Sequence, residues 1–273
     1  MAKWLFRDEL QLIEINVPRA ALHLARAVAY PDLNVAAYMS RLHDLSEEIV
    51  GAIDVNASPA YQAEQLSDSL FGRLGFSGDK KSYNDPRNSY LNEVIDRRQG
   101  IPITLSVLYI DIASRLGIPA YGIGLPGHFI VGIREADGDT WIDPFHDGRR
   151  LDLTDCAELI RLASGYEGPL EAGWFAPVSA RATLARMLNN LRAAYVASSS
   201  WPQAADVIQL LREVQPHEAE HLRDLGLVYY HQHHLPQAAH FLNAYLQRTP
   251  DAPDAQTIRD GVKPILDEWV PMN

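Results

Sequence analysis

The strongest constraint on the fold is an internal repeat in the last third of the chain. Residues 191–216 and 225–250 superimpose when one is shifted by 34 residues. The matched pairs are Tyr195 and Tyr229, Pro202 and Pro236, Ala204 and Ala238, Ala205 and Ala239, and Pro216 and Pro250. A fixed period with small residues where two helices touch, and proline closing each unit, is typical of stacked helical hairpins. The repeat therefore predicts an all-α domain over residues 179–273.

This pattern resembles the tetratricopeptide repeat. Two repeats leave both ends of the stack open, so we expect residues 184–191 to join the first helix and residues 254–270 to form a capping helix. The alternative is a plain helical hairpin extension. The resemblance implies a face that binds a protein or peptide partner. The predicted contact residues are Tyr195, Tyr229, Tyr230 and His233.

Upstream, the hydrophobic pattern predicts an α+β domain over residues 1–178. Apolar residues recur at three- and four-residue intervals in three segments, which indicates amphipathic helices. These segments are residues 19–31, 35–50 and 58–75. A fourth helix is expected over residues 85–100, capped by Asp85 or Asn88 and ended by Gly100.

A central helix over residues 102–116 is apolar on almost every side, so we expect it in the middle of the domain. Short strands follow and form a hairpin over residues 128–145, with its turn at Asp137 and Gly138. Helices followed by antiparallel strands are typical of an α+β fold. The expected boundary between the domains is the loop at residues 172–179.

Composition limits the classes of partner. The net charge of −11 over 273 residues offers no basic surface for a phosphate backbone, so direct nucleic-acid binding is disfavoured. The chain has no apolar run of about 18 residues and no signal-peptide pattern, so we expect no membrane association and a cytoplasmic location. Cys156 is the only cysteine, which excludes an internal disulfide and a multi-cysteine zinc site. We expect no metal and no cofactor.

Three motifs resemble a known family. They are "DPRNSYLNEVIDRRQGIPITLSVLY" (85–109), "LPGHF" (125–129) and "WIDPF" (141–145). Followed by tetratricopeptide-like repeats, they resemble the SirB1 family of bacterial proteins, and a similar segment occurs in certain eukaryotic F-box proteins. The resemblance implies a transglutaminase-like, papain-like domain of helices and antiparallel sheet. The family's name implies a regulatory role in gene expression, which an acidic chain would exert through protein contacts.

The resemblance also implies a catalytic site with cysteine, histidine and acid in that chain order. His128 and Asp143 correspond to the histidine and the acid, and Pro102 occupies the position of the nucleophile. The chemistry needs a thiolate at a helix amino terminus, where the helix dipole and unpaired N–H groups stabilise negative charge. Proline suits the first turn of a helix but has no group that attacks a carbonyl. The site is therefore interpreted as degenerate.

Other nucleophiles are left open as weaker alternatives. Ser106 lies near the same helix face as Pro102, about 6 Å further along the axis, but a hydroxyl within a helix usually bonds a backbone carbonyl. Thr104 is subject to the same objection. Cys156 follows the histidine and the acid in the chain, and we expect it to be a buried structural thiol.

The contact between His128 and Asp143 rests on the resemblance. A turn at Asp137 and Gly138 would set Asp143 opposite Gly132, about 13 Å along the strand from His128, so contact needs a bulge or a shifted turn. The alternative is that His128 caps the strand and Asp143 organises its turn. A polar pocket beside the pair would be completed by Asn88, Tyr90, Asn92 and Ser106.

We interpret the chain as a non-catalytic interaction protein. The competing hypothesis is a hydrolase or amide-transfer enzyme in which His128 acts as general base on water or Ser106, and a third is a module that binds a small molecule in the pocket. His217 and His221, with the histidines of residues 231–234, have metal-like spacing but lack a well-placed further ligand. We expect them on a solvated repeat surface.

Overall fold

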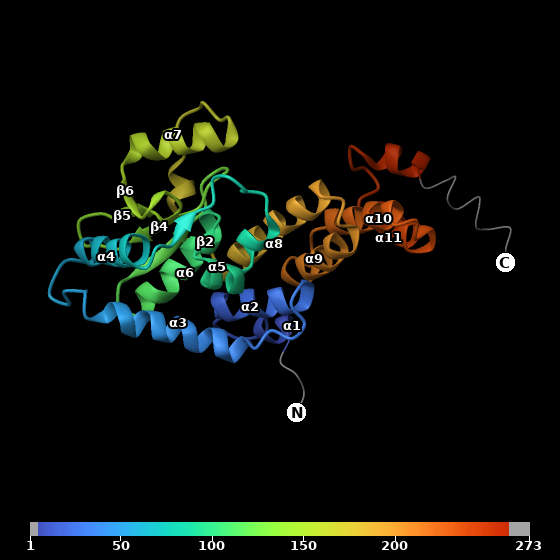
Figure 1. Cartoon of the computed structure of the whole chain (residues 1–273). Helices are drawn as coiled ribbons and strands as arrows, with labels where there is room; N and C mark the ends of the chain where they lie inside the picture. The colour runs from blue at the N-terminus through green and yellow to red at the C-terminus, as the bar shows by residue number, and fades with distance from the viewer. Residues whose placement is uncertain (1–4, 262–273) are drawn as a thin grey trace. The chain divides into compact units, whose positions relative to one another are not determined.

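The computed structural model describes residues 5–261 (Figure 1). The chain divides into two compact units, residues 1–187 and 188–273, and the division falls within helix α8 (Ala180–Ala197). A domain that folds independently over residues 1–178 stays a prediction. No helix among residues 5–261 is both long enough and apolar enough to cross a membrane.

Helices open the first unit where the periodic segments predicted them. They are α2 (Val17–Val28), α3 (Val35–Val50) and α4 (Pro59–Ser67), and α4 continues as a π-helical turn, η1 (Asp68–Arg73). A short helix that was not predicted, α1 (Phe6–Glu9), precedes them. Side-chain caps define two of the starts: Asn16 Oδ1 accepts from the amide of Arg19 at 2.9 Å, and Asn34 Oδ1 accepts from Ala37 at 3.1 Å.

The helix predicted over residues 85–100 is broken in the structure. A 3-10 turn, η2 (Pro86–Ser89), is followed by an extended Tyr90 and then by α5 (Leu91–Arg97). The break has a tertiary cause, because the carbonyl of Asn88 accepts from Thr104 Oγ1 at 2.7 Å instead of continuing a helix. Arg98, with φ 57°, ends α5, so the predicted end at Gly100 was wrong.

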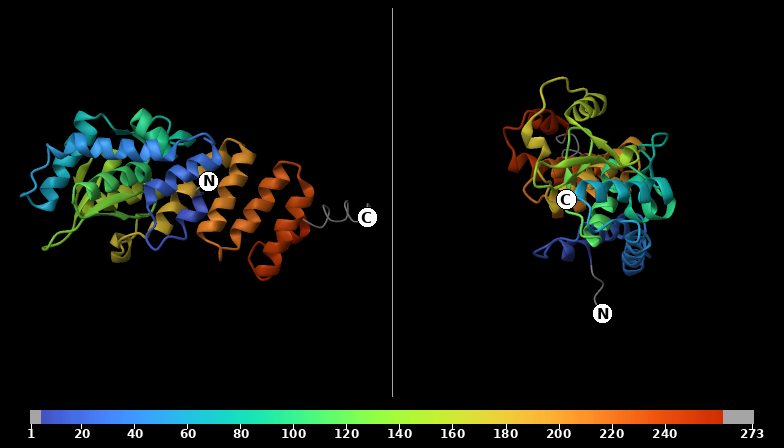
Figure 2. Two further views of the ribbon diagram at one scale, coloured as in Figure 1. Left: turned by 90° about the horizontal axis from the view of Figure 1, so that it is seen from below. Right: turned by 90° about the vertical axis from the view of Figure 1, so that its left-hand side faces the viewer.

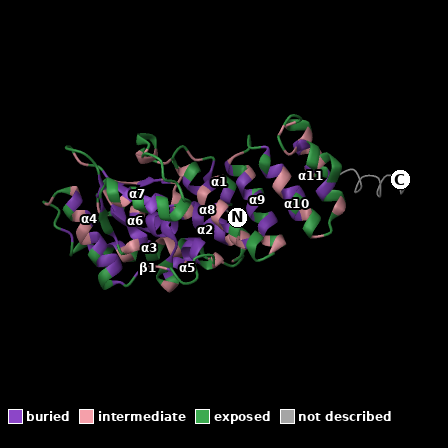
Figure 3. Ribbon diagram, turned by 90° about the horizontal axis from the view of Figure 1, so that it is seen from above, coloured by how far each residue is buried: buried purple, intermediate pink, exposed green. Residues whose placement is uncertain are grey.

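Two short strands, one before η2 and one after α5, form a parallel pair. Strands β1 (Ser77–Gly78) and β2 (Gln99–Gly100) pair, with Gly78 opposite Gly100. The central helix α6 (Pro102–Arg115) starts directly after this pair. Its first eight residues are all buried, and it packs against α3, strand β4 (Ile130–Ile133) and the 3-10 turn η3 (Pro144–His146). Figure 3 shows buried residues gathered along α6 and its neighbours.

An antiparallel sheet of four strands covers this helix, in the order β3-β4-β5-β6. The strands are β3 (Ala120–Ile123), β4 (Ile130–Ile133), β5 (Thr140–Asp143) and β6 (Arg149–Leu151). The turn η3 (Pro144–His146) joins β5 to β6, and α7 (Leu153–Ser164) and the 3-10 turn η4 (Ala172–Phe175) follow. Strand β6 was not predicted, because Arg149 and Arg150 are both exposed and carry no apolar alternation.

The second unit consists of antiparallel helices, as the repeat predicted (Figure 2). After α8 come α9 (Trp201–Val214), α10 (Glu220–His231) and α11 (Leu235–Arg248). The helices α10 and α11 approach closely at Gly226, where a Cβ atom would lie 2.5 Å from Leu242 Cγ. Of the predicted capping helix, residues 255–261 are helical. Its remaining residues lie outside the described part of the chain.

Candidate functional site

His128 and Asp143 meet because the hairpin register differs from the predicted one. Strands β4 and β5 pair Gly132 with Trp141, so in the same register Asp143 lies level with Ile130. Only two residues, about 7 Å along a strand, then separate Ile130 from His128. The side chains reach each other, and His128 Nε2 lies 3.1 Å from Asp143 Oδ1. The predicted pairing of Asp143 with Gly132 was therefore wrong by two residues.

The cause of the shift is the position of the turn. It lies at Ala136 and Asp137 and not at Asp137 and Gly138. Moving the centre of a hairpin by one residue changes every cross-strand pair by two and keeps each side chain on its face of the sheet. The sequence analysis allowed contact between His128 and Asp143 only with a bulge or a shifted turn, and the structure has the shifted turn.

The carboxylate of Asp143 is shared by three donors. Its Oδ1 also accepts from the amide of Phe145 at 3.0 Å, which starts η3, and its Oδ2 lies 2.7 Å from His146 Nδ1. Asp143 thus both contacts His128 and organises the turn, two roles that the sequence presented as alternatives. His146 was missed, although its spacing of three residues from Asp143 in "DPFH" would have indicated it.

The electrostatics favour an ionised Asp143. The side chain is fully buried, and burial alone would raise its pKa. The hydrogen bonds from His128 and His146 outweigh that cost and hold the pKa of Asp143 well below its usual value. A carboxylate only accepts hydrogen bonds, so each imidazole nitrogen that faces it carries a proton.

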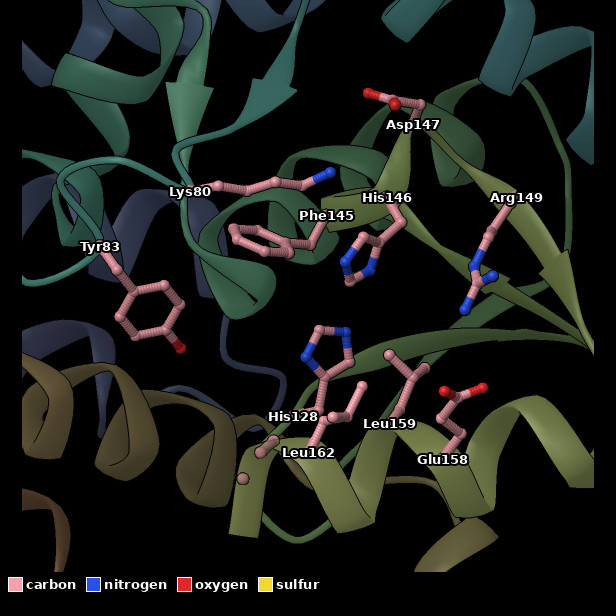
Figure 4. A pocket seen from close by; sticks show the side chains of 12 residues that line it. Lys80, Tyr83, His128, Phe145, His146, Asp147, Arg149, Glu158, Leu159 and Leu162 are labelled. Atoms are coloured by element: carbon pink, nitrogen blue, oxygen red, sulfur yellow. The ribbon is translucent and has the colours of Figure 1, made fainter.

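A pocket of about 660 Å³ opens beside this cluster (Figure 4). His128 and His146 face each other within it, while Lys80 and Tyr83 project from the loop that follows β1. Phe145 from η3 and Leu159 from α7 give apolar walls. A concave site with apolar walls and a few convergent polar groups is the usual form of a ligand site.

Asn88 stands outside this pocket and shapes its wall. Its amide nitrogen donates to Asp79 Oδ2 at 3.1 Å and to the carbonyl of Ser82 at 2.8 Å. Its amide oxygen accepts from Arg97 Nη1 at 3.2 Å. These bonds fix the loop of residues 79–85, which carries part of the pocket lining.

The other residues expected in the pocket are also buried structural groups. Tyr90 packs edge-to-face on Tyr30, with ring centroids 5.3 Å apart. Ser106 Oγ is within 3.4 Å of the carbonyl of Phe129 and is fully buried. Asn92 is buried as well. Of the residues that the sequence suggested, His128 lines the pocket, whereas Asn88, Tyr90, Asn92 and Ser106 do not.

The second unit has a groove of its own, which we call the repeat groove. Its volume is about 340 Å³, and it lies between α8, α9 and α10. Its lining includes Arg192, Val196, Trp201, Asp224, Leu227 and His231. The indole of Trp201 stacks on the imidazole of His231 with ring centroids 4.3 Å apart.

The four predicted contact residues of the repeats lie elsewhere. Tyr195 is buried, and Tyr229 stacks on Phe241 with ring centroids 5.5 Å apart. Tyr230 and His233 are exposed but do not line the repeat groove. The 34-residue period located the repeats, but it did not indicate which side chains face the groove.

The histidines of the repeats form no metal cluster within the described part of the chain. His217 is exposed, and His221 is buried with neither ring nitrogen hydrogen-bonded. Burial lowers the pKa of His221. Among residues 5–261, the group of three ligand side chains placed to hold an ion is instead His128, Asp143 and His146.

Residues 36–189 match the family described as the transglutaminase-like superfamily. The chain belongs to this superfamily. Residues 191–262 match the tetratricopeptide repeat. The predicted fold class, a transglutaminase-like domain of helices and antiparallel sheet followed by helical repeats, is confirmed.

Several known proteins are similar to this transglutaminase-like chain. A UPF0162 protein of Xylella fastidiosa is 36% identical over 92% of this chain and 90% of its own length. A UPF0162 protein of Pseudomonas aeruginosa is 32% identical over 81% of this chain and 80% of its own. Human F-box only protein 21 is 34% identical over 45% of this chain and 20% of its own. A crystal structure of menin has a TM-score of 0.42 at 12% identity, covering 88% of this chain and 67% of menin's.

In this transglutaminase-like domain, Pro102 is the first residue of α6 and is buried. Its ring fits the first helical turn, where a missing N–H costs nothing. Thr104 serves the same turn, because its Oγ1 accepts from the amide of Ile101 at 3.1 Å. The residues at the start of α6 therefore satisfy the backbone, and none of them offers a nucleophile to the pocket.

The thiol of Cys156 is no substitute. It is fully buried in an apolar cluster with Leu125, Ile130 and Leu159, and burial raises its pKa to about 12. A thiol in such surroundings stays protonated at neutral pH and is a poor nucleophile. Cys156 is a core residue.

Proposed function

We propose that the protein is an interaction protein that binds a peptide segment of a partner in the repeat groove. The observation that carries this proposal is the exposure of two apolar side chains on the groove, Val196 at 42% and Leu227 at 40%. Apolar side chains gathered in an exposed groove are typical of binding sites. The stacked Trp201 and His231 add the rigid aromatic surface that often contributes most to binding.

The chemistry of the groove indicates the kind of peptide. Arg192 and Asp224 form an ion pair on its wall. A groove of about 340 Å³ suits a peptide that inserts one or two large apolar side chains and places polar groups beside the ion pair. A regulatory role through such a partner belongs to the same proposal, as does the absence of cysteine-based catalysis, which the buried Pro102 supports.

The proposal is tested with a pair of matched leucine variants. Leu227→Glu places a charge in the groove, while Leu153→Glu alters a leucine of α7 that is 56% exposed and lines neither pocket. Partners captured by the full chain are quantified by mass spectrometry, and the affinity of the responsible peptide is then measured by fluorescence anisotropy. We expect Leu227→Glu to weaken binding at least about tenfold, which is 1.4 kcal/mol. Equal binding by both variants would show that the repeat groove is not the docking site.

The pocket of the first unit supports a second candidate function. The hydrogen bond between His128 and Asp143 beside an open pocket is suited to a general base that deprotonates water for hydrolysis of an amide or ester. Ser106 is not part of this candidate, because its hydroxyl is buried outside the pocket lining. A substrate panel is compared between the unmodified chain and His128→Ala. Turnover that the variant abolishes supports the candidate, and no turnover across the panel argues against it.

A further inference from the structure

The His128–Asp143–His146 cluster combines two imidazole nitrogens with a carboxylate. One ligand atom from each of the three residues can be chosen so that all lie within 4.8 Å of one another. Zinc bonds of 2.0 to 2.2 Å hold tetrahedral ligands about 3.4 Å apart. His128 Nε2 lies 3.1 Å from Asp143 Oδ1, and His146 Nδ1 lies 2.7 Å from Asp143 Oδ2. If each oxygen of the carboxylate faces the ion, each of these contacts widens by less than about 1 Å to reach that spacing.

The charge of the cluster favours a cation. The side chain of Asp143 is fully buried, and its contacts are two imidazoles and one backbone amide. No lysine or arginine among residues 5–261 forms an ion pair with it. Buried charges are paired or coordinate metals, so a cation at this point would be stabilised by the buried carboxylate of Asp143.

The cluster also has an open side. His128 and His146 both line the pocket of about 660 Å³, and their rings face each other in it (Figure 4). Three protein ligands with a free position toward a cavity are typical of catalytic zinc sites, whereas structural sites are closed by four ligands.

We propose that His128, Asp143 and His146 bind a zinc ion. Two imidazoles and one carboxylate suit zinc or a similar transition ion better than magnesium or calcium, which prefer oxygen ligands alone. The ion replaces the two imidazole protons that face Asp143, and each proton moves to the other ring nitrogen or to solvent. A water in the free position would have its pKa lowered to about 7 by the zinc. The sequence did not predict this site because His146 was overlooked.

The test uses the full chain without an affinity tag, treated with a chelator and then titrated with zinc against a chromophoric indicator. We expect one ion per chain, and no comparable binding of magnesium. His146→Ala should raise the Kd at least about a hundredfold, since this variant removes a ligand and not merely a supporting group, for which losses of 10- to 100-fold are usual. The side chain of His146 is 32% exposed, so its truncation is compatible with folding.

A matched control separates this site from the repeat histidines. His233→Ala removes an exposed histidine beside His231 and His234 and should leave the Kd unchanged. Zinc lost with His233→Ala but retained with His146→Ala would overturn the proposal, as would a chain that takes up no zinc. Cobalt provides a readout that needs no variant, because a four-coordinate site gives intense visible absorption and a surface ion in octahedral water does not. The zinc site is independent of peptide binding by the repeats, so either proposal can fail alone.

Discussion

Substitution of Gly78 tests the close packing of β1 against η3, the turn that carries part of the candidate site. A Cβ atom at this position would lie 2.4 Å from the carbonyl oxygen of Phe145 and 2.6 Å from its Cδ2 atom. Ordinary contacts begin near 3.4 Å, so Gly78→Ala requires β1 and η3 to separate by about 1 Å. Phe145 lies between Asp143 and His146 in the chain, so the separation should also disturb their hydrogen bond.

The magnitude follows from two opposing effects. Overpacking of this kind destabilises the fold by about 1 to 3 kcal/mol. Replacing glycine by alanine also lowers the conformational entropy of the unfolded chain, which stabilises the fold by about 0.4 to 1 kcal/mol. Central values of about 2 and about 0.7 kcal/mol give a net loss in the free energy of unfolding of about 1.3 kcal/mol. A domain of this size loses about 2 to 4 °C in Tm for each kcal/mol, so we expect Tm to decrease by roughly 3 to 5 °C.

The assay is thermal unfolding followed by circular dichroism, with Gly51→Ala as control. Gly51 ends α3 with φ −69°, and a Cβ atom there would meet nothing within 4 Å. The control should melt within about 2 °C of the unmodified chain or slightly above it. A Gly78→Ala chain that melts with the control would refute the close approach of β1 to η3.

Three further predictions concern buried polar groups. Burial lowers the pKa of His23 to about 4. This value is below the unfolded value near 6.5, so the neutral His23 contributes its full stabilisation above pH 6.5. The free energy of unfolding should then fall by up to about 3 kcal/mol as the pH decreases toward 4. His23→Leu should remove that slope from urea unfolding curves, and an unchanged slope would contradict the assignment. Cys156, with its pKa raised to about 12 by burial, should react with iodoacetamide only after denaturation, and rapid labelling of the native chain would show that its cluster opens. Arg186 Nη2 donates to the carbonyl of Leu125 at 2.7 Å and also to the carbonyl of His128. Arg186→Met should therefore lower the free energy of unfolding by about 1 to 3 kcal/mol and speed amide hydrogen exchange in the loop between these two residues. Unchanged exchange would rule out this role.

Much of the fold was predictable because it depends on local periodicity. The apolar spacing located α2 and α3, the 34-residue repeat located the helices of the second unit, and Pro102 marked the start of α6. The single helix expected over residues 85–100 failed for a reason that no local pattern contains. The carbonyl of Asn88 is bonded by Thr104, which lies 16 residues further along the chain.

The candidate site was only partly predictable. The resemblance to a known family indicated His128 and Asp143, but their contact depends on a turn that lies one residue before the predicted position at Asp137 and Gly138. His146 joins them through the 3-10 turn η3, and its spacing of three residues from Asp143 was the local signal that could have indicated it. The pocket lining depends on long-range packing of the 79–85 loop and α7, and no spacing in the sequence reports that.

One carboxylate at the end of β5 has several tasks at once: it starts η3, orients two imidazoles and holds a negative charge in the interior. Loss of turnover in an ancestor would therefore not release Asp143 from selection, because the same atoms are needed to shape the chain. A histidine and an acid retained in a relative are for this reason weak evidence that the relative is an enzyme. They are equally weak evidence that it is not.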